Sequence, residues 1–370
     1  MSKHRNQRRT GGTVPTKDQT LVTLREAHLG PMRFMNILSV FELGIVDLMR
    51  KQPNQRFTAE QLGAAVGATP DAIYQLLLLP VKDGLIALDE RTGEYTLDGL
   101  AQLGDEDFAR VLPWMNMIKV VCLRQLYYLT DSIRAGEVVG LQKLFGLTGT
   151  FYEATLGNDE LRSAWGSMMD AVTEFIDPWF FDNVEVGAGQ KVLDLAGNTG
   201  LGAILTYRHK GVENLQVTCF DFPEKEAEAL ANFEAAGLAG HCSFIGGDVF
   251  KGVPKGFDLV LIKHFLDMFD RDNVLKILRA VAGALEPGGQ VYILVPIYPE
   301  DIRESSSVDF FPSYFLGCTM AQGGPQKVST YSAWLEEAGF EVTRAVTQDH
   351  ATMPADMVPV HGIICGTRKA

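Results

Sequence analysis

The sequence predicts an α/β protein in which a Rossmann-like, doubly wound parallel sheet follows a mainly helical front part. The stretch KVLDLAGNTG (191–200) is a short apolar run that ends in Asp194 and then turns at once on small residues, as a parallel strand does before a helix. After this stretch, continuous apolar strands alternate with helices, which is typical of a sheet covered on both faces. Before it, apolar residues recur at helical spacing.

Composition limits the classes of function. A chain of 370 residues, 46% of them apolar, is long enough for two domains with substantial cores. The formal net charge of −13 argues against a nucleic-acid surface, which needs excess Lys and Arg to neutralise phosphates. No apolar run is long and charge-free enough to span a bilayer, so we expect no membrane partner. Five cysteines lack the spacing of metal ligands and favour a reducing, cytoplasmic location without a bound metal: Cys122, Cys219, Cys242, Cys318 and Cys365.

The front part divides into a tail and a small module. Residues 1–18 are basic and contain no apolar core, so we expect a disordered tail and not a secretory signal. Over residues 19–104, a long helical pattern precedes a helix capped by Thr58, a second helix closed by Gly84, and two short strands around a turn at Thr92–Gly93. Helix, helix and hairpin predict a winged-helix module. Such a module binds DNA or serves as a dimerisation scaffold, and the acidic balance favours the scaffold.

Two further parts complete the chain. Residues 105–186 form helices rich in Trp, Tyr and Met, which we expect to line a substrate site, and residues 187–370 form the sheet domain. The strands expected in the doubly wound parallel sheet are QKVLDLAG, QVTCFDF, CSFIGGDVF, FDLVLIKHF, GGQVYILVPI, FEVTRAVTQ and HGIICGTR. Helices are expected from Leu201, through EKEAEALANFEAAG and over RDNVLKILRAVAGAL.

Charged residues follow several of these strands where they end. Asp194, Asp221, Asp248 and the segment Lys263–Asp267 fall at such ends. Ligands of doubly wound sheets bind outside the carboxyl ends of the strands, so these residues should converge on one crevice. Asp221 is placed to hydrogen-bond a ribose diol, because it ends the strand after the small-residue turn. His264 lies at a strand tip and is therefore also a functional candidate.

These features together resemble the S-adenosylmethionine-dependent small-molecule O-methyltransferases of bacteria and plants. The resemblance extends from Leu21 to Thr367. GGDVF (246–250) is similar to the family's adenine-binding turn, ALEPGGQVYILVPIYPE (284–300) to the strand that carries a catalytic acid, and WLEEAGF (334–340) to its C-terminal helix. The resemblance implies an enzyme with S-adenosylmethionine as cofactor and a small-molecule substrate. It also implies that the winged-helix module is the dimerisation domain of a homodimer.

The resemblance places eight residues at the cofactor: Asp194, Gly197 and Gly200 along its methionine part, Lys263 near its sulfonium, Asp221 at its ribose hydroxyls, and Asp248, Val249 and Phe269 around its adenine. This sequence departs from the family in the first turn. That turn is usually richer in glycine, and here Ala196 and Asn198 stand at two of the glycine positions. Asparagine tolerates a positive φ, so we expect cofactor binding to survive.

The resemblance also implies that the catalytic positions are altered. Family members that methylate hydroxyls use a general-base histidine set by acidic partners. The histidine position falls on Asp267, within FLDMFDRDNVLKILR, and the aspartate after it falls on Met268. The acid at the end of the next strand falls on Val295, and the acid of the Gly-Gly-x-Glu-Arg segment falls on Gln326. The polar catalytic positions are therefore changed together.

The altered positions bear on the kind of nucleophile. Methyl transfer from a sulfonium is an in-line displacement, and it needs a base only if the nucleophile must lose a proton. Loss of the base and its orienting acids fits a thioether sulfur, which carries no proton. We therefore expect S-methylation of a thioether carboxylate such as 4-methylthio-2-hydroxybutyrate, the reaction of the family subset that leads to dimethylsulfoniopropionate.

Two alternatives stay open. An O- or N-methyltransferase of an aromatic secondary metabolite would use Asp267 or His264 as its base. An aspartate with an ordinary pKa of about 4 is a poor base for a phenol unless it is strongly desolvated. In a different class, a non-catalytic winged-helix regulator would sense a ligand through its C-terminal domain.

Candidate contacts to the substrate come from the helical stretch before the sheet: Arg124, Tyr127, Tyr152, Trp165, Met168 and Met169. The resemblance places Met168 and Met169 near the substrate. Aromatic and Met residues at helical spacing also form ordinary cores, but such walls would stabilise a sulfonium product through cation–π contacts. Arg124 lies among apolar neighbours and is either paired structurally or ready to bind a substrate carboxylate.

Overall fold

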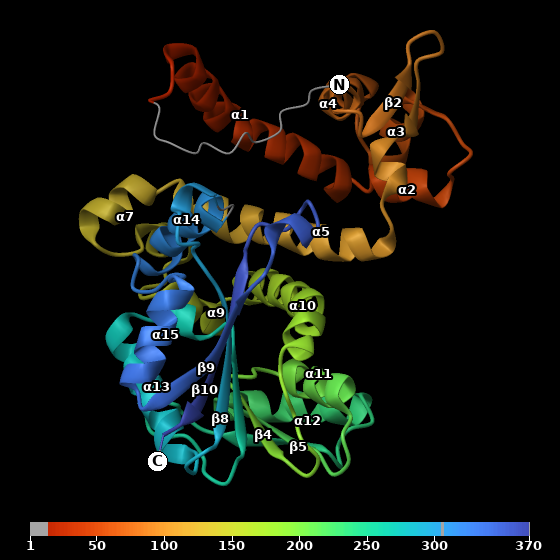
Figure 1. Ribbon diagram of the computed structural model, residues 1–370. Coiled ribbons are helices and arrows are strands. Elements are labelled where there is room, and N and C mark those ends of the chain that lie inside the picture. Colours follow the sequence, from red (N-terminus) through yellow and green to blue (C-terminus); the bar gives the residue numbers. More distant parts are fainter. Residues whose placement is uncertain (1–13, 305–306, 370) are drawn as a thin grey trace. The chain divides into compact units, whose positions relative to one another are not determined.

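The computed structural model describes residues 14–304 and 307–369, so residues 1–13 of the expected disordered tail lie outside the described residues. The chain forms two compact units, the first ending at Met115 and the second beginning at Asn116 (Figure 1). The helices between residues 116 and 186 therefore belong to the same compact unit as the large sheet.

The first unit is mainly helical and carries a small antiparallel sheet. Its elements are α1 (Lys17–Glu42), α2 (Ile45–Lys51), β1 (Phe57–Thr58), α3 (Ala59–Val66), α4 (Pro70–Lys82), β2 (Ile86–Asp89), β3 (Glu94–Leu97) and the 3₁₀ turn η1 (Gly99–Gln102). The strands are ordered β1-β3-β2. Helix α1 begins within the stretch expected as a tail. The long helical pattern is two helices, because Gly44 has a φ of 74° and interrupts it.

Local signals explain the smaller helices and the hairpin of the first unit. The Thr58 hydroxyl accepts a hydrogen bond from the Gln61 N–H (3.3 Å), and the Gln61 side chain accepts one from the Thr58 N–H (2.9 Å). This capping box starts α3. Gly93 has a φ of 73° in the turn between β2 and β3. The expected order of helix, helix and hairpin is confirmed.

The second unit opens with helices. The elements before its sheet are α5 (Asp105–Met117, shared with the first unit), the π-helical turn η2 (Ile118–Leu123), α6 (Arg124–Leu126), α7 (Leu129–Ala135), α8 (Val139–Phe145), α9 (Phe151–Gly157) and α10 (Asp159–Asp182). Helix α10 is capped by Asn158, whose side chain accepts a hydrogen bond from the Leu161 N–H (3.0 Å).

The large sheet has seven strands in the order β6-β5-β4-β7-β8-β10-β9. The strands are β4 (Lys191–Leu195), β5 (Gln216–Asp221), β6 (Cys242–Gly246), β7 (Leu259–Lys263), β8 (Gln290–Pro296), β9 (Phe340–Thr347) and β10 (His361–Arg368). The first five in this order pair in parallel, as expected. The expectation of parallel pairing is wrong for β10, which is antiparallel to both β8 and β9. A loop with one short 3₁₀ turn joins β9 to β10, and no crossover helix returns the chain to the same end.

Helices cover both faces of this sheet (Figure 1). They are α11 (Leu201–Lys210), α12 (Glu226–Ala235), α13 (Arg271–Ala284) and α15 (Val328–Glu337), whereas α14 (Ser307–Thr319) packs against the helices α6, α7 and α9. Helices α13 and α15 bury apolar side chains against β7, β8 and β10, and α11 and α12 lie on the other face. The carboxyl ends of the parallel strands are thereby left as the open edge of the sheet.

No single helix in the described part of the chain has both the length and the apolar content to cross a membrane. Helices α3 and α4 meet these criteria only as a pair, and they are bent by 108° where they join.

Candidate active site

A cavity of about 560 Å³ lies at the carboxyl ends of β4, β5 and β7 in the second unit. It brings together eleven of the residues singled out from the sequence: Tyr152, Trp165, Met169, Asp194, Gly197, Asp221, Asp248, Val249, Lys263, His264 and Phe269. Five others do not line it: Arg124, Tyr127, Met168, Gly200 and Asp267. Among the described residues, no group of three or more His, Cys, Asp or Glu side chains could hold a metal ion.

The turn after β4 adopts the conformation that a glycine-rich turn would have. Ala196 and Asn198, which replace glycines, have φ values of 59° and 51°. The Asn198 N–H donates a hydrogen bond to Oδ2 of Asp221 (2.8 Å). Gly197 has no room for a side chain, because a Cβ there would lie 2.5 Å from Oδ2 of Asp194. The substitutions thus preserve the path of the backbone at the cost of two left-handed non-glycine residues.

Gly200, at the end of this turn, is required for helix packing. Its φ is 84°, and a Cβ on it would lie 2.4 Å from the ring of Phe233 on α12. Gly200 therefore allows α11 to start close against α12, and it does not face the cavity.

Asp221 is oriented by backbone donors. Besides the bond from Asn198, its Oδ1 accepts a hydrogen bond from the Phe222 N–H (2.7 Å). The carboxylate is partly exposed at the cavity wall and retains lone pairs for further donors. Two vicinal hydroxyl groups, as on a ribose, fit this arrangement.

An aromatic slot lies beside Asp248 and Val249. Oδ1 of Asp248 accepts a hydrogen bond from the Phe250 N–H (3.0 Å). The ring of Phe250 meets that of Phe269 edge to face, with centroids 5.5 Å apart, and both residues line the cavity. A flat heterocycle such as adenine can pack among these groups.

A buried charge cluster lies at the tips of β4 and β7. The ammonium of Lys263 forms an ion pair with Oδ2 of Asp177 on α10 (2.7 Å). Asp194 lies close by, and burial raises its pKa to about 6 although Lys263 opposes the shift. Sequence reasoning missed Asp177. A carboxylate in the middle of the apolar stretch EFIDPWFF was a usable signal, since a buried charge needs a partner.

The sequence resemblance places Asp267 at the position of a general base. It lies in the 3₁₀ turn η4 (Leu266–Met268) and is buried, and its Oδ1 has no hydrogen-bond partner among the described residues. Burial raises the pKa of Asp267 to about 7. The next residue, Met268, lines the cavity. The carboxylate is thus desolvated, which removes the objection that an aspartate is too weak a base.

His264 lines the cavity with a strained backbone. Its φ is 50°, and its ring meets that of His361 edge to face at 5.0 Å. Nδ1 of His361 shares a hydrogen bond with Oε1 of Gln348 (3.1 Å). Burial holds the pKa of His264 well below its ordinary value, so the ring is neutral near pH 7.

A further part of the lining is apolar and aromatic, and it consists of Tyr152, Leu156, Trp165, Met169, Phe265 and Met268. The ring of Tyr152 meets that of Trp165 edge to face at 5.8 Å. The Tyr152 hydroxyl is 3.4 Å from that of Tyr314, a further residue that the sequence did not suggest. We call this part of the cavity the acceptor end.

The other candidate substrate contacts lie elsewhere. Arg124 forms an ion pair with Glu160 (2.8 Å), and its guanidinium lies over the ring of Phe145 (5.2 Å). Tyr127 is 84% exposed, and Met168 is buried on α10. The structure thus selects the first of the two possibilities for Arg124, a structural ion pair.

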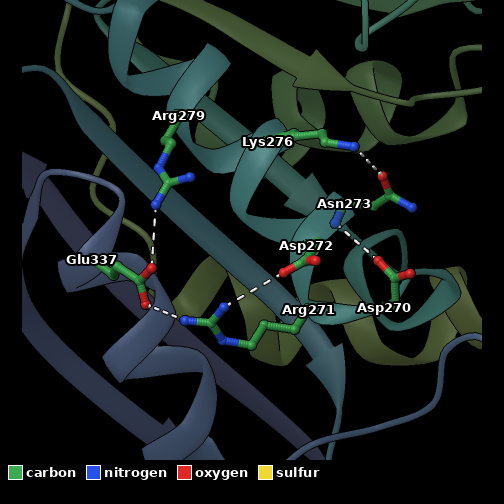
Figure 2. A network of polar contacts seen from close by, with 7 residues as sticks. All are labelled: Asp270, Arg271, Asp272, Asn273, Lys276, Arg279 and Glu337. Carbon is green, nitrogen blue, oxygen red and sulfur yellow. Dashed lines mark hydrogen bonds and ion pairs between the residues drawn. The ribbon is translucent and has the colours of Figure 1, made fainter.

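One wall of the cavity is held by polar contacts between α13 and α15 (Figure 2). Glu337 on α15 accepts hydrogen bonds from Arg271 (2.6 Å) and Arg279 (3.2 Å) on α13. Asp270 caps α13 by accepting from the Asn273 N–H (2.9 Å). Both Asp270 and Asn273 line the cavity, so this network orients the start of α13 toward it.

Known proteins are similar to most of this chain. A family model described as an O-methyltransferase domain matches residues 126–341. The mitomycin biosynthesis 6-O-methyltransferase of Streptomyces lavendulae is 25% identical over 334 residues, which are 88% of this chain and 90% of the relative. The L-tyrosine C(3)-methyltransferase of the same organism is 24% identical over 315 residues, 84% of each chain. The solved structure of human N-acetylserotonin methyltransferase in complex with SAM has the same fold, with a TM-score of 0.77, 19% identity, and coverage of 97% of this chain and 100% of that one.

Proposed function

The chain belongs to the O-methyltransferase family, and from this premise we propose that it methylates a hydroxyl group of a small aromatic molecule with S-adenosylmethionine as the methyl donor. The observation that carries the proposal is the aromatic acceptor end of the cavity; Asp267, at the expected base position, is buried beside it and does not line it. Membership of an enzyme family also disfavours the ligand-sensing regulator.

The cavity fits S-adenosylmethionine along its length. Asp221, Asp194 and Lys263 end three neighbouring strands, β5, β4 and β7, about 5 Å apart. We assign Asp221 to the ribose hydroxyls, Asp194 and Lys263 to the amino-acid end, and the slot beside Asp248 and Phe269 to the adenine. When bound, the cofactor supplies a methyl group that its sulfonium has already activated.

The nature of the acceptor follows from the other end of the cavity. Tyr152, Trp165 and Met169 provide a wall suited to a flat ring. Methyl transfer depends mainly on alignment, so such a wall contributes by holding the acceptor oxygen in line with the methyl group. We assign the proton transfer to Asp267, whose side chain does not line the cavity and must meet the hydroxyl past its neighbour Met268, which does. It accepts the proton most readily when its pKa lies near the working pH.

The main expectation from the sequence, S-methylation of 4-methylthio-2-hydroxybutyrate, has no support from the relatives, whose names describe O- and C-methylation. The charges of the cavity also disfavour it. The described lining residues include two lysines and no arginine. Both lie at the cofactor end, since Lys263 ends β7 beside Asp194 and Lys225 follows Asp221. A carboxylate-bearing acceptor would therefore find no free cation at the acceptor end.

We further propose that the protein acts as a homodimer. Several large apolar side chains along α1 are exposed, which supports burial against a second copy: Leu21, Val22, Leu24, Leu29 and Met32. The cytoplasmic location stays a prediction. It rests on five free cysteines, all of them buried.

The proposal is tested with S-adenosylmethionine that carries a labelled methyl group. The purified protein is incubated with a panel of phenols and catechols, of aromatic amines, and of thioethers that include 4-methylthio-2-hydroxybutyrate. We expect label in methyl ethers of uncharged aromatic hydroxyls. Label that appears only in a sulfonium product would contradict the proposal and support S-methylation of a thioether. Label on a carbon atom of an aromatic ring would agree with the family but contradict the proposed O-methylation.

A further inference from the structure

The ion pair between Lys263 and Asp177 needs an explanation beyond stability. The Asp177 side chain is 0% exposed and that of Lys263 is 7% exposed. The rings of Phe180 and Phe181 lie 5.8 and 5.4 Å from the ammonium. Burying two charges among aromatic rings carries a large desolvation penalty, and apolar residues of similar volume are often no less stable. A functional reason for the pair is therefore expected.

A third charge faces the same place. A Cβ built on Gly202, in the first turn of α11, would lie 2.5 Å from Oδ2 of Asp194 and 2.9 Å from the Lys263 ammonium. Both charged groups thus pack against one glycine. Oδ2 of Asp194 and Oδ1 of Asp177 have no hydrogen-bond partner among the described residues. The cluster holds two carboxylates and one ammonium, so it can take up one more cation.

The three residues differ in their access to the cavity. Asp194 and Lys263 line it, whereas Asp177 lies behind Lys263 and does not. Asp177 can therefore act on a ligand only through Lys263. Without Asp177, the nearest carboxylate for the Lys263 ammonium is Asp194, and that pairing would neutralise both groups that face the cavity.

We propose that Asp177, Lys263 and Asp194 together recognise the zwitterionic amino-acid end of the cofactor, with Asp177 as the positioning residue that keeps Lys263 away from Asp194. Lys263 then pairs with the ligand carboxylate and Asp194 with its ammonium. The inference rests on the proposed function, since it takes S-adenosylmethionine as the ligand. It adds a residue outside the cavity that decides how tightly the amino-acid end binds.

Two ligands separate this role from a general effect on the fold. S-adenosylhomocysteine carries the amino-acid end, and 5′-methylthioadenosine lacks it but keeps the adenosine. Calorimetric titration of Asp177→Asn should show roughly 10- to 100-fold weaker binding of S-adenosylhomocysteine and unchanged binding of 5′-methylthioadenosine. Asp177→Glu should recover part of the loss. As a matched control, Asp221→Asn should weaken both ligands alike.

The outcomes distinguish the inference from the proposed function. Equal losses for both ligands in Asp177→Asn, or no loss for either, would overturn the inference and leave the proposed function standing. Failure of the unaltered protein to bind either ligand would overturn both. If Asp177→Asn does not fold, the double variant Asp177→Asn/Lys263→Met removes the unpaired ammonium. It should bind 5′-methylthioadenosine normally and S-adenosylhomocysteine weakly, and tight binding of the latter would refute the inference.

Discussion

Replacing Asp267 with asparagine should make the protein more stable at alkaline pH while it removes most of the activity. Burial raises the pKa of this carboxyl from an ordinary 3.8 to about 7. The folded protein therefore holds a proton at pH values where the unfolded chain has lost it. The free energy of unfolding falls as the pH rises from about 4 to about 7 and then levels off.

The size of the effect follows from the shift. Each pKa unit corresponds to about 1.4 kcal/mol, so the full shift from 3.8 to about 7 changes the free energy of unfolding by about 4 kcal/mol. About 2 kcal/mol of this is lost between pH 5.5 and pH 8.5. Asparagine does not titrate. Relative to the unaltered protein, Asp267→Asn should thus gain about 2 kcal/mol of stability over that interval. The buried histidines titrate equally in both proteins and cancel in the comparison.

Urea unfolding curves of the two proteins at pH 5.5, 7 and 8.5 measure this difference. Asp272→Asn is the matched control, because it lies five residues further on and its side chain is 81% exposed. In the methyl-transfer assay, loss of the base should lower the rate by roughly 10²- to 10⁴-fold. Stability differences that stay constant across the three pH values would show that Asp267 is hydrated and ionised in the folded protein. The assignment of Asp267 as a base tuned by burial would then be refuted.

Three further substitutions test other parts of the argument. Gly200→Ala should destabilise the protein by roughly 2–4 kcal/mol in urea unfolding, because the new Cβ meets the Phe233 ring. The control Gly189→Ala should cost only about 1 kcal/mol, because Gly189 has a similar φ of 71° but open space around it. Equal effects would contradict the packing role of Gly200. Glu337→Gln should cost about 1 kcal/mol or less at low salt and nothing at high salt, since the ion pairs of α13 and α15 are half exposed. Arg124→Met should leave the KM for the acceptor unchanged, because Arg124 pairs with Glu160. A raised KM would show that Arg124 contacts the substrate.

The cofactor end of the site was predictable because it depends on local order in the chain. Asp194, Asp221 and Asp248 each lie within two residues of the end of a strand, and the tips of parallel strands share one edge of a sheet. The left-handed conformation of Asn198 was also predictable, because few residues adopt a positive φ with little strain and asparagine is one of them.

Other placements were not predictable, because they depend on packing between distant segments. Arg124 sits among apolar neighbours in the sequence, yet its partner Glu160 lies 36 residues away on another helix. The antiparallel direction of β10 depends on which end of the sheet the chain re-enters after β9, and an apolar strand pattern carries no direction.

The sequence by itself determined the fold class, the family and the row of acidic residues at the strand tips, since each is encoded in periodicity and in motifs of a few residues. Only the tertiary structure decided which of the site's side chains are buried and which are paired. The pKa of Asp267 depends on which segments exclude water from its carboxylate. The pairing of Lys263 joins two residues that are 86 positions apart. Burial and ion pairing are properties of the packed protein, and for this reason the sequence favoured an acceptor without a proton whereas the structure supports a hydroxyl with a desolvated base.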